Sequence, residues 1–317
     1  MDSFRSEEGA VIVLVALLLT IFLGFLALVV DIGFLYLARN RLINALDAAT
    51  LAGVQKLPDH PTEARQITFN YADKNNLDID KVLIEVTNND HQIVAQTSRQ
   101  VKMNFASVFG VDQVKVTAKS GAKVGQVTAI RGAVPFGIVS QQFSYGEKYY
   151  LRYGSGKADE EDGARNGNFG ALALGGQGAK NYEQNLKNGY DDQLEIGQTV
   201  TTEPGNMAGP TLRGINERLD GCQRLIPCTY DTVERGCSRL VFVPVIDQLG
   251  NGRSEATVVG FAAFFLEGTD SKKEGKKGES KGQSTYVEGR FINWLSTTGQ
   301  LGSEGQNFGL RTVKLVD

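Results

Sequence analysis

The sequence predicts an α+β protein: one transmembrane helix near the N-terminus, an alanine-rich extension of that helix, a small α+β section and a mainly antiparallel β domain. Three observations predict this organisation. Residues 10–30 contain no charged side chain, although the mean hydropathy of the chain is −0.19. Leucine and alanine then recur at a spacing of seven residues up to Ala52. From residue 131 onward, short apolar segments alternate with glycine-rich turns.

The predicted boundaries follow these changes in pattern. They define a short N-terminal tail (1–9), the transmembrane helix (10–30), an extended amphipathic helix (31–57), a small α+β section (58–130) and a glycine-rich, mainly β domain (131–317) with a flexible loop (269–285).

The apolar run has the length of a membrane span. Its 21 residues rise by about 1.5 Å each and so cover about 31 Å, the thickness of a bilayer's hydrocarbon core. A cleaved signal peptide is the alternative, but its apolar region is usually about 7–15 residues long and ends in a small-x-small cleavage site. The run here is longer, and the residues at its end, Val29, Val30 and then Asp31, do not form a small-x-small site. The sequence therefore favours a retained signal-anchor.

The extended helix carries a repeat of two registers. No proline occurs from residue 31 to residue 57, and polar residues lie between the repeat positions. The repeat positions, which we predict to pack against other helices or strands, are Leu35, Leu42 and Ala49 in one register and Ala38, Ala45 and Ala52 in the other. This seam could pack on the protein's own soluble part, or laterally against other helices in an assembly; small residues allow a close approach in either case.

The section 58–130 is predicted to combine one helix with several strands. Pro61 suits the first turn of a helix. Residues 83–87 and 114–118 alternate as strands do, and residues 91–105 form a further alternating segment after the turn at 88–90.

The β domain is predicted from alternation and turn signals. Its predicted strands are 145–153, 193–200, 240–246, 256–266 and 286–295. One helix is expected at 211–219, and Asn251-Gly252 predicts a tight hairpin between two of the strands. Residues 269–285 contain five lysines, three acids and no apolar side chain, which predicts a solvated loop at a hairpin tip.

The N-terminal block resembles a known family. The residues that carry the resemblance are Glu8-Gly9-Ala10, Val30-Asp31-Ile32-Gly33, Leu35-Tyr36-Leu37-Ala38-Arg39, Asn44-Ala45-Leu46-Asp47-Ala48-Ala49 and Leu51-Ala52-Gly53. In this order they closely resemble TadE/TadG-like Flp pilus-assembly proteins. The resemblance implies a bacterial or archaeal protein with a cytoplasmic N-terminus and its bulk outside. It also implies a minor, pseudopilin-like or anchoring role in the tight-adherence machinery.

One position departs from the pattern of processed prepilins. Cleavage after Gly9 would call for glutamate at the fifth following position, which is Leu14. The departure favours the uncleaved, TadG-like type. Basic residues give no help with orientation, because Arg5 precedes the run whereas Arg39 and Arg41 follow it; long C-terminal domains, however, translocate largely regardless of such counts. Read strictly, this count weakly favours the opposite orientation, whereas the family resemblance implies an N-terminus in the cytoplasm and C-terminal domains outside, which is the orientation we expect.

The chain has three cysteines, Cys222, Cys228 and Cys237. Their spacing, C-x5-C-x8-C, differs from the closely spaced pairs that are typical of zinc sites. An external location favours one disulfide among them, with the third cysteine free or paired with another molecule. A metal site and three reduced thiols are the alternatives. The prediction is a disulfide whose pairing is open, and no metal site.

Composition excludes some functions and leaves others open. The net charge is −3, and positive and negative residues are mixed along the chain, which argues against binding to nucleic acid. No common catalytic motif occurs, and two histidines leave little for general-base work. We therefore predict no enzyme, no catalytic residue and no cofactor.

The expected role is that of a membrane-anchored, extracytoplasmic structural component of a Flp/Tad-type pilus or related secretion system. Its expected partners are the lipid bilayer, other Tad/Flp pilus-assembly proteins and a second copy of the chain. The alternative is a membrane-tethered surface hydrolase, or a wall- or ligand-binding module on the same kind of anchor.

Overall fold

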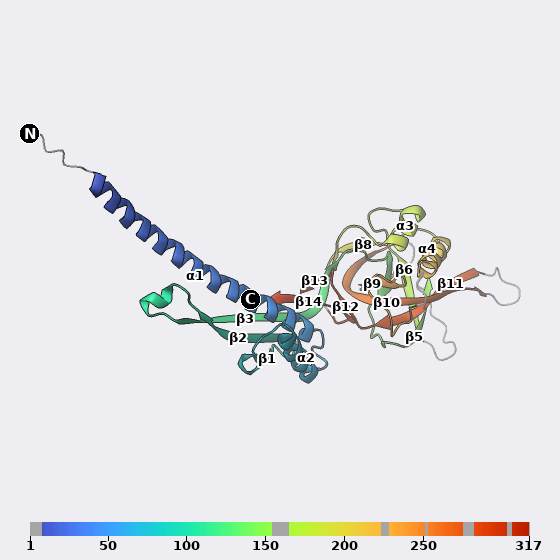
Figure 1. Ribbon diagram of the computed structural model, residues 1–317. Coiled ribbons are helices and arrows are strands. Elements are labelled where there is room, and N and C mark those ends of the chain that lie inside the picture. Colours follow the sequence, from blue (N-terminus) through green and yellow to red (C-terminus); the bar gives the residue numbers. More distant parts are fainter. Residues whose placement is uncertain are drawn as a thin grey trace, which may run out of the picture. The chain divides into compact units, whose positions relative to one another are not determined.

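The computed structural model describes residues 8–153, 165–222, 228–250, 253–274, 282–302 and 306–316. The chain divides into two compact units, of which the first contains residues 1–124 and 314–317 and the second contains residues 125–313. The described residues form α-helices, short 3-10 helices and mixed sheets whose strand pairs are mostly antiparallel (Figure 1). The predicted α+β class, with a long apolar helix at the N-terminus, is confirmed.

The first unit begins with α1 (Glu8–Val54), a helix of 47 residues that joins the predicted transmembrane helix and its extension without a break (Figure 1). By length and composition alone, α1 is able to cross a membrane. None of the side chains from Val11 to Val30 is buried within the structure. This part of α1 therefore fits a membrane anchor.

The core of the first unit packs on the C-terminal part of α1. It contains α2 (Pro61–Lys74), η1 (Ile79–Lys81) and an antiparallel sheet in the order β1 (Leu83–Thr87), β2 (Gln92–Lys102) and β3 (Gln113–Ile130). The buried side chains of this core are Leu42, Ala45, Leu46 and Ala49 of α1 with Ala72, Leu77, Val82, Ala95, Val116 and Ala118. The C-terminal part of α1 thus contributes to the hydrophobic core of the first unit.

Two local features explain how these elements fit together. Asn88, Asn89 and Asp90 all have positive φ (55°, 50° and 62°), a conformation that these residue types tolerate, and they form the turn predicted between β1 and β2. Gly53 lies where α1 meets α2: a Cβ atom at this position would be 1.9 Å from Thr68 Oγ1. Only glycine allows this approach of the two helices.

The second unit is built around a ring of strands. In the order β11-β5-β6-β4-β9-β10 each strand is hydrogen-bonded to the next, and β10 also pairs with β11, so the ring is closed. The bounds are β4 (Phe136–Val139), β5 (Lys148–Tyr153), β6 (Arg165–Ala171), β9 (Leu240–Ile246), β10 (Glu255–Glu274) and β11 (Gly282–Ile292). Two of the pairings, β4–β9 and β5–β6, are parallel. Closure leaves few free strand edges in this unit.

Shorter elements complete the second unit. β8 (Thr199–Thr201) extends the ring at β10, and the end of β3 pairs with β7 (Leu194–Glu195) and β13 (Gln300–Gly302). β12 (Trp294–Ser296) pairs in parallel with β14 (Leu310–Val316).

Two helices pack together, and the second of them also packs against the ring strands β10 and β11. They are α3 (Ala179–Asn188) and α4 (Ala208–Asp220). One core cluster combines Tyr182 and Leu186 of α3 with aromatic side chains that include Phe264 and Phe291 of the ring. Sequence reasoning predicted α4 but missed α3.

The structure differs from the sequence prediction in the lysine-rich segment 269–285. Residues 269–274 continue β10 and residues 282–285 belong to β11, with Glu274 paired with Gly282. These residues are therefore strand and not loop. A segment without apolar side chains is able to form a strand because the hydrogen bonds between strands use backbone groups. Residues 275–281, and the predicted Asn251-Gly252 turn, lie outside the described residues.

Candidate functional site

Asp31 is the only charged residue between Glu8 and Arg39, and the structure satisfies its carboxylate. The side chain is only 3% exposed. Its Oδ1 atom accepts a hydrogen bond from the backbone N–H of Asn104 at 3.0 Å, and its Oδ2 atom accepts two more, from Phe105 at 3.0 Å and Ala106 at 2.7 Å. These donors open η2 (Ala106–Phe109), whose first N–H groups have no partner within the helical turn. Asp31 thereby joins α1 to the tip of the β2–β3 hairpin.

The hairpin tip presents large apolar side chains to the outside. The exposed fractions are 46% for Phe105, 82% for Val108, 87% for Phe109 and 45% for Val111. Soluble proteins rarely expose such a continuous apolar group without a use for it. We call these four residues the apolar tip. Sequence reasoning did not predict a role for these residues; the signal was a hairpin end rich in large apolar residues.

The apolar tip lies beside the apolar part of α1. Together they form a groove of about 420 Å³, lined by Ile21, Gly24, Phe25, Ala27 and Leu28 of α1 and by Phe105, Ala106, Val108 and Phe109 of the hairpin. Past Asp31 the outer face of α1 remains apolar, since Ile32, Tyr36 and Leu37 are 56%, 66% and 50% exposed. The apolar surface of this unit therefore extends beyond residue 30 and includes the hairpin.

The predicted helix-packing residues lie mostly inside the first unit. Leu42, Ala45 and Ala49 are buried in its core, while Leu35, Ala38 and Ala52 are half-buried. Of the two interpretations of the seam, the structure shows packing on the protein's own soluble part. Ala45 and Ala49 are therefore not available for lateral contact with other helices.

The predicted disulfide is not supported. Cys222 follows α4, Cys237 precedes β9, and all three cysteines are free thiols. The Cys222 Sγ atom lies 3.5 Å from Sγ of Cys228 and 3.9 Å from Sγ of Cys237, whereas a disulfide requires about 2.05 Å. The structure brings all three sulfur atoms within 4.8 Å of one another, so no pair is singled out for a bond.

The three thiols differ in their electrostatic surroundings. A hydrogen bond from the Cys228 backbone lowers the pKa of Cys222, and the neighbouring thiols and the charge of Arg239 act in the same direction. Burial raises the pKa of Cys237 to about 12. Cys222 is half-buried, and Cys228 and Cys237 are buried. Cys222, the most accessible of the three thiols, is thus more acidic than Cys237.

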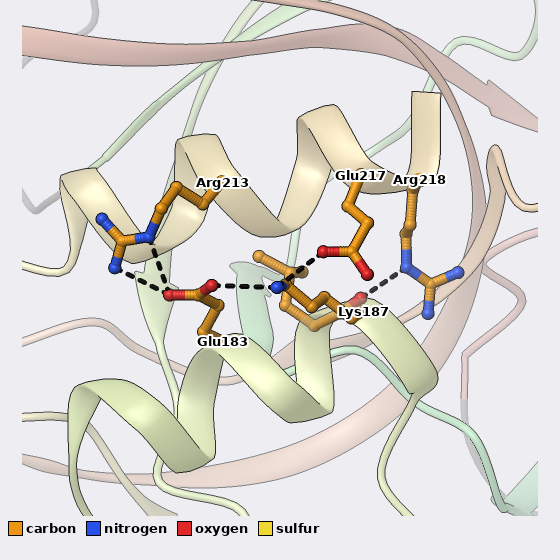
Figure 2. A network of polar contacts seen from close by, with 6 residues as sticks. Glu183, Lys187, Arg213, Glu217 and Arg218 are labelled. Carbon is orange, nitrogen blue, oxygen red and sulfur yellow. Dashed lines mark hydrogen bonds and ion pairs between the residues drawn. The ribbon is translucent and has the colours of Figure 1, made fainter. Parts of the chain in front are cut away.

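A polar network holds α3 against α4, the helix that leads to Cys222 (Figure 2). Glu183 accepts hydrogen bonds from Arg213 Nη2 at 2.7 Å and Nε at 2.9 Å, and Lys187 bridges Glu183 and Glu217 at 3.0 and 2.6 Å. Arg213 holds the pKa of the Glu183 carboxyl below its usual value, with Lys187 as the second cause.

Arg218 connects this helix pair to the cysteine segment. Its Nε donates to the Leu186 carbonyl at the end of α3 (Figure 2), and its Nη1 donates to the Ser238 carbonyl at 3.1 Å. In return, Ser238 Oγ donates to the Arg218 carbonyl at 2.7 Å. Burial lowers the pKa of Arg218 to about 10. These bonds fix Cys237, the neighbour of Ser238, relative to the end of α4.

Comparison with known proteins gives a match for the N-terminal helix. Residues 9–56 match the family model described as "Putative Flp pilus-assembly TadE/G-like". The resemblance that the sequence predicted is thus confirmed for α1, and it points to involvement in pilus assembly. Neither the curated proteins nor the solved structures contain a match to the chain.

Proposed function

We propose that this chain is a membrane-anchored, extracytoplasmic structural component of a Flp/Tad-type pilus or a related secretion system, and that it is not an enzyme. One observation carries the proposal: the segment that matches the pilus-assembly family, 9–56, is the same helix that is long, apolar and unburied over its first half. The folded units would lie on the outer side, as the family implies, with residues 1–9 in the cytoplasm.

The Asp31 contacts support placement of the hairpin at the membrane surface. A carboxylate in hydrocarbon costs about 2.5–3.5 kcal/mol at the centre of a bilayer, and less toward its edge. In this protein three N–H groups of the hairpin surround the carboxylate. The hairpin thereby removes the one charge that would otherwise face lipid along residues 10–38 of α1.

The apolar tip completes the contact with the bilayer. Because it adjoins the apolar groove at Ile21–Leu28, a bilayer that surrounds α1 would also surround the tip. Burial of a Val or Phe side chain stabilises by about 1.5–3 kcal/mol. Val108 and Phe109, the most exposed of the four tip residues, would then anchor the first unit in the outer leaflet and fix its orientation on α1.

The contacts with other pilus-assembly proteins then fall to the lipid-facing part of α1. The seam at Leu42, Ala45 and Ala49 is used within the first unit. Residues 11–20 are all exposed. Their surface is therefore available to helices of the pilus machinery or of a second copy.

The proposal is tested by an exchange of residues 10–20 for an unrelated apolar sequence of equal length. This exchange keeps the anchor, Asp31 and the groove, and it changes only the helix surface offered to partners. In cells that lack the natural gene, we expect the wild-type gene to restore Flp pili in the sheared surface fraction. The exchanged variant should leave them at the level of the deletion strain, at equal protein abundance in the membrane.

Two results would contradict the proposal. If deletion of the gene leaves surface pili unchanged, the chain is not a component of their assembly. If the exchanged variant restores pili fully, α1 serves only as a tether. The alternative of a surface enzyme or binding module on a shared type of anchor would then be favoured.

A further inference from the structure

All three cysteines of the chain meet at one point of the second unit, although the sequence places them on separate segments. One follows α4, one lies in the connection and one precedes β9. The Sγ–Sγ distances from Cys222 are 3.5 and 3.9 Å, and all three sulfur atoms lie within 4.8 Å of one another. Isolated core cysteines pack as small apolar groups and have no need to gather their sulfur atoms.

The distances fit a tetrahedral metal ion. With Zn–S bonds of about 2.3 Å and tetrahedral angles, two thiolates on one Zn²⁺ lie about 3.8 Å apart. The measured 3.5 and 3.9 Å are on either side of this value. A disulfide, at about 2.05 Å, would have to pull one pair together and leave the third sulfur behind.

We infer that Cys222, Cys228 and Cys237 bind one zinc ion through their three thiolates. Soft sulfur ligands select zinc and similar thiophilic metals over Ca²⁺ and Mg²⁺. Among the described residues no histidine, aspartate, glutamate or fourth cysteine joins the group. The fourth position is therefore taken by water or a small solute, on the side of half-buried Cys222.

The charge around the cluster supports the same assignment. Three thiolates and one Zn²⁺ carry a net charge of −1, and the positive charge of Arg239 acts on Cys222. The Nε atom of Arg239 is buried and has no hydrogen-bond partner within the described part of the chain. The half-buried guanidinium of Arg239 would compensate the negative charge of the cluster, as outer partners of metal sites commonly do.

The bonds of Arg218 and Ser238 would hold the ligands in place. They connect the end of α4 to the segment before β9, on which Cys237 lies. A metal ion at the thiols would join the same two segments a second time and include Cys228. The ion would thus join two segments of the second unit, and this role is independent of the proposed role in pilus assembly.

Cobalt titration tests the inference. The full-length protein, without a histidine tag, is purified in detergent with reductant, stripped with a chelator and titrated with Co²⁺. We expect saturation at one equivalent with a thiolate-to-cobalt charge-transfer band, and displacement of Co²⁺ by one equivalent of Zn²⁺. Cys222→Ser removes the most accessible ligand and should weaken binding on the order of 100-fold or more, since loss of even an outer partner costs about 10–100-fold.

The control variant is Glu217→Gln, which removes an exposed carboxylate of α4 but no thiol and no hydrogen bond to the cysteine segment described above. Co²⁺ should still saturate this variant at one equivalent. A measurement on the wild-type protein guards against misfolding of the cysteine variant: a mercurial added to the zinc-loaded protein should release one zinc as three thiols react.

Three results would overturn the inference. They are the absence of equimolar Co²⁺ binding by the reduced wild-type protein, equal binding by Cys222→Ser, and a cobalt spectrum without the thiolate band. If the isolated protein contains copper and not zinc, the assignment of the metal as zinc is wrong.

Discussion

At Asp31 the structure pairs a single carboxylate with three backbone N–H groups at 2.7–3.0 Å. Such charge-assisted bonds are stronger than neutral ones, and an N–H group left unpaired in an apolar setting costs about 1–3 kcal/mol. The sequence places this aspartate at the end of the apolar run, but the position of its partners, more than 70 residues later, depends on how the hairpin folds back along α1. No local pattern predicts that contact.

We therefore expect Asp31→Asn to loosen η2. The amide keeps one oxygen acceptor, but its NH₂ group cannot accept, so at least one of the N–H groups of Asn104, Phe105 and Ala106 loses its partner. Hydrogen exchange of these amides in lipid nanodiscs should become at least about 10-fold faster, since a loss of about 1.4 kcal/mol corresponds to that factor. Asp47→Asn, on the same helix, is the control and should change nothing. Unchanged protection in Asp31→Asn would show that the contact does not hold the tip.

Gly53 and Gly33 form a matched pair on α1. A Cβ atom at Gly53 would meet Thr68 Oγ1 at 1.9 Å and the Ala64 carbonyl oxygen at 2.6 Å, whereas none of the described atoms lies within 4 Å of a Cβ at Gly33. Gly53→Ala should force α2 away and destabilise the first unit by about 1–3 kcal/mol. Gly33→Ala should be neutral or stabilise by up to about 1 kcal/mol, because alanine favours helix. Thermal unfolding in detergent distinguishes the two; equal midpoints would contradict the packing described for α1 and α2.

Among the elements, those with strong local signals could be predicted from sequence. The apolar run and the seven-residue repeat predicted α1, and a run of β-branched residues predicted β9 at 240–246. α3 escaped because only Tyr182 and Leu186 of its ten residues are buried, and two such residues at a spacing of four are a short signal in an otherwise polar segment. The pairs β4–β9 and β11–β5, which the ring needs, escaped for another reason: they join segments distant in sequence.

The α3–α4 pair should respond to acid through Glu183. Arg213 and Lys187 lower the pKa of this carboxyl in the folded protein. Their contribution is therefore complete above the ordinary glutamate pKa and is lost as the pH falls through the lowered, folded-state value. Because Arg213 is 61% exposed, we expect a contribution of about 0.2–1 kcal/mol. In Glu183→Gln, thermal unfolding should lose this part of its dependence on pH.

The control is Glu217→Gln, which removes an exposed carboxylate that pairs with the Lys187 ammonium. It should change the pH profile less than Glu183→Gln does. Equal pH profiles in wild type and Glu183→Gln would show that solvent screens the network completely.

The apolar tip can be placed relative to lipid by fluorescence. Trp294 is the only tryptophan of the chain, so Phe109→Trp in a Trp294→Phe background reports on the tip alone. In vesicles of brominated phospholipid we expect strong quenching by acyl-chain bromine. The control is Leu83→Trp in the same background, since Leu83 is 59% exposed on β1; it should be quenched little. Equal quenching at both positions, or none at Phe109→Trp, would contradict insertion of the tip.

For the whole molecule, sequence and structure contribute different parts of the account. The family match covers residues 9–56, and the hydropathy of that segment alone predicts an anchor. The cysteine cluster illustrates what spacing could not predict: C-x5-C-x8-C resembles no common metal motif, yet α4 and β9 bring the three sulfur atoms together. The disulfide prediction relied on compartment and not on geometry, and the sulfur–sulfur distances do not support it.

The central claim, a chain anchored through α1 with both folded units outside, is tested most directly by protease accessibility. The full chain carries one epitope at each terminus and is expressed in cells whose cytoplasmic membrane is intact but whose outer layers admit protease. We expect loss of the C-terminal epitope, with the N-terminal epitope protected until the membrane is dissolved. Protection of the C-terminal epitope and loss of the N-terminal one would reverse the topology. The proposed extracytoplasmic role would then be untenable.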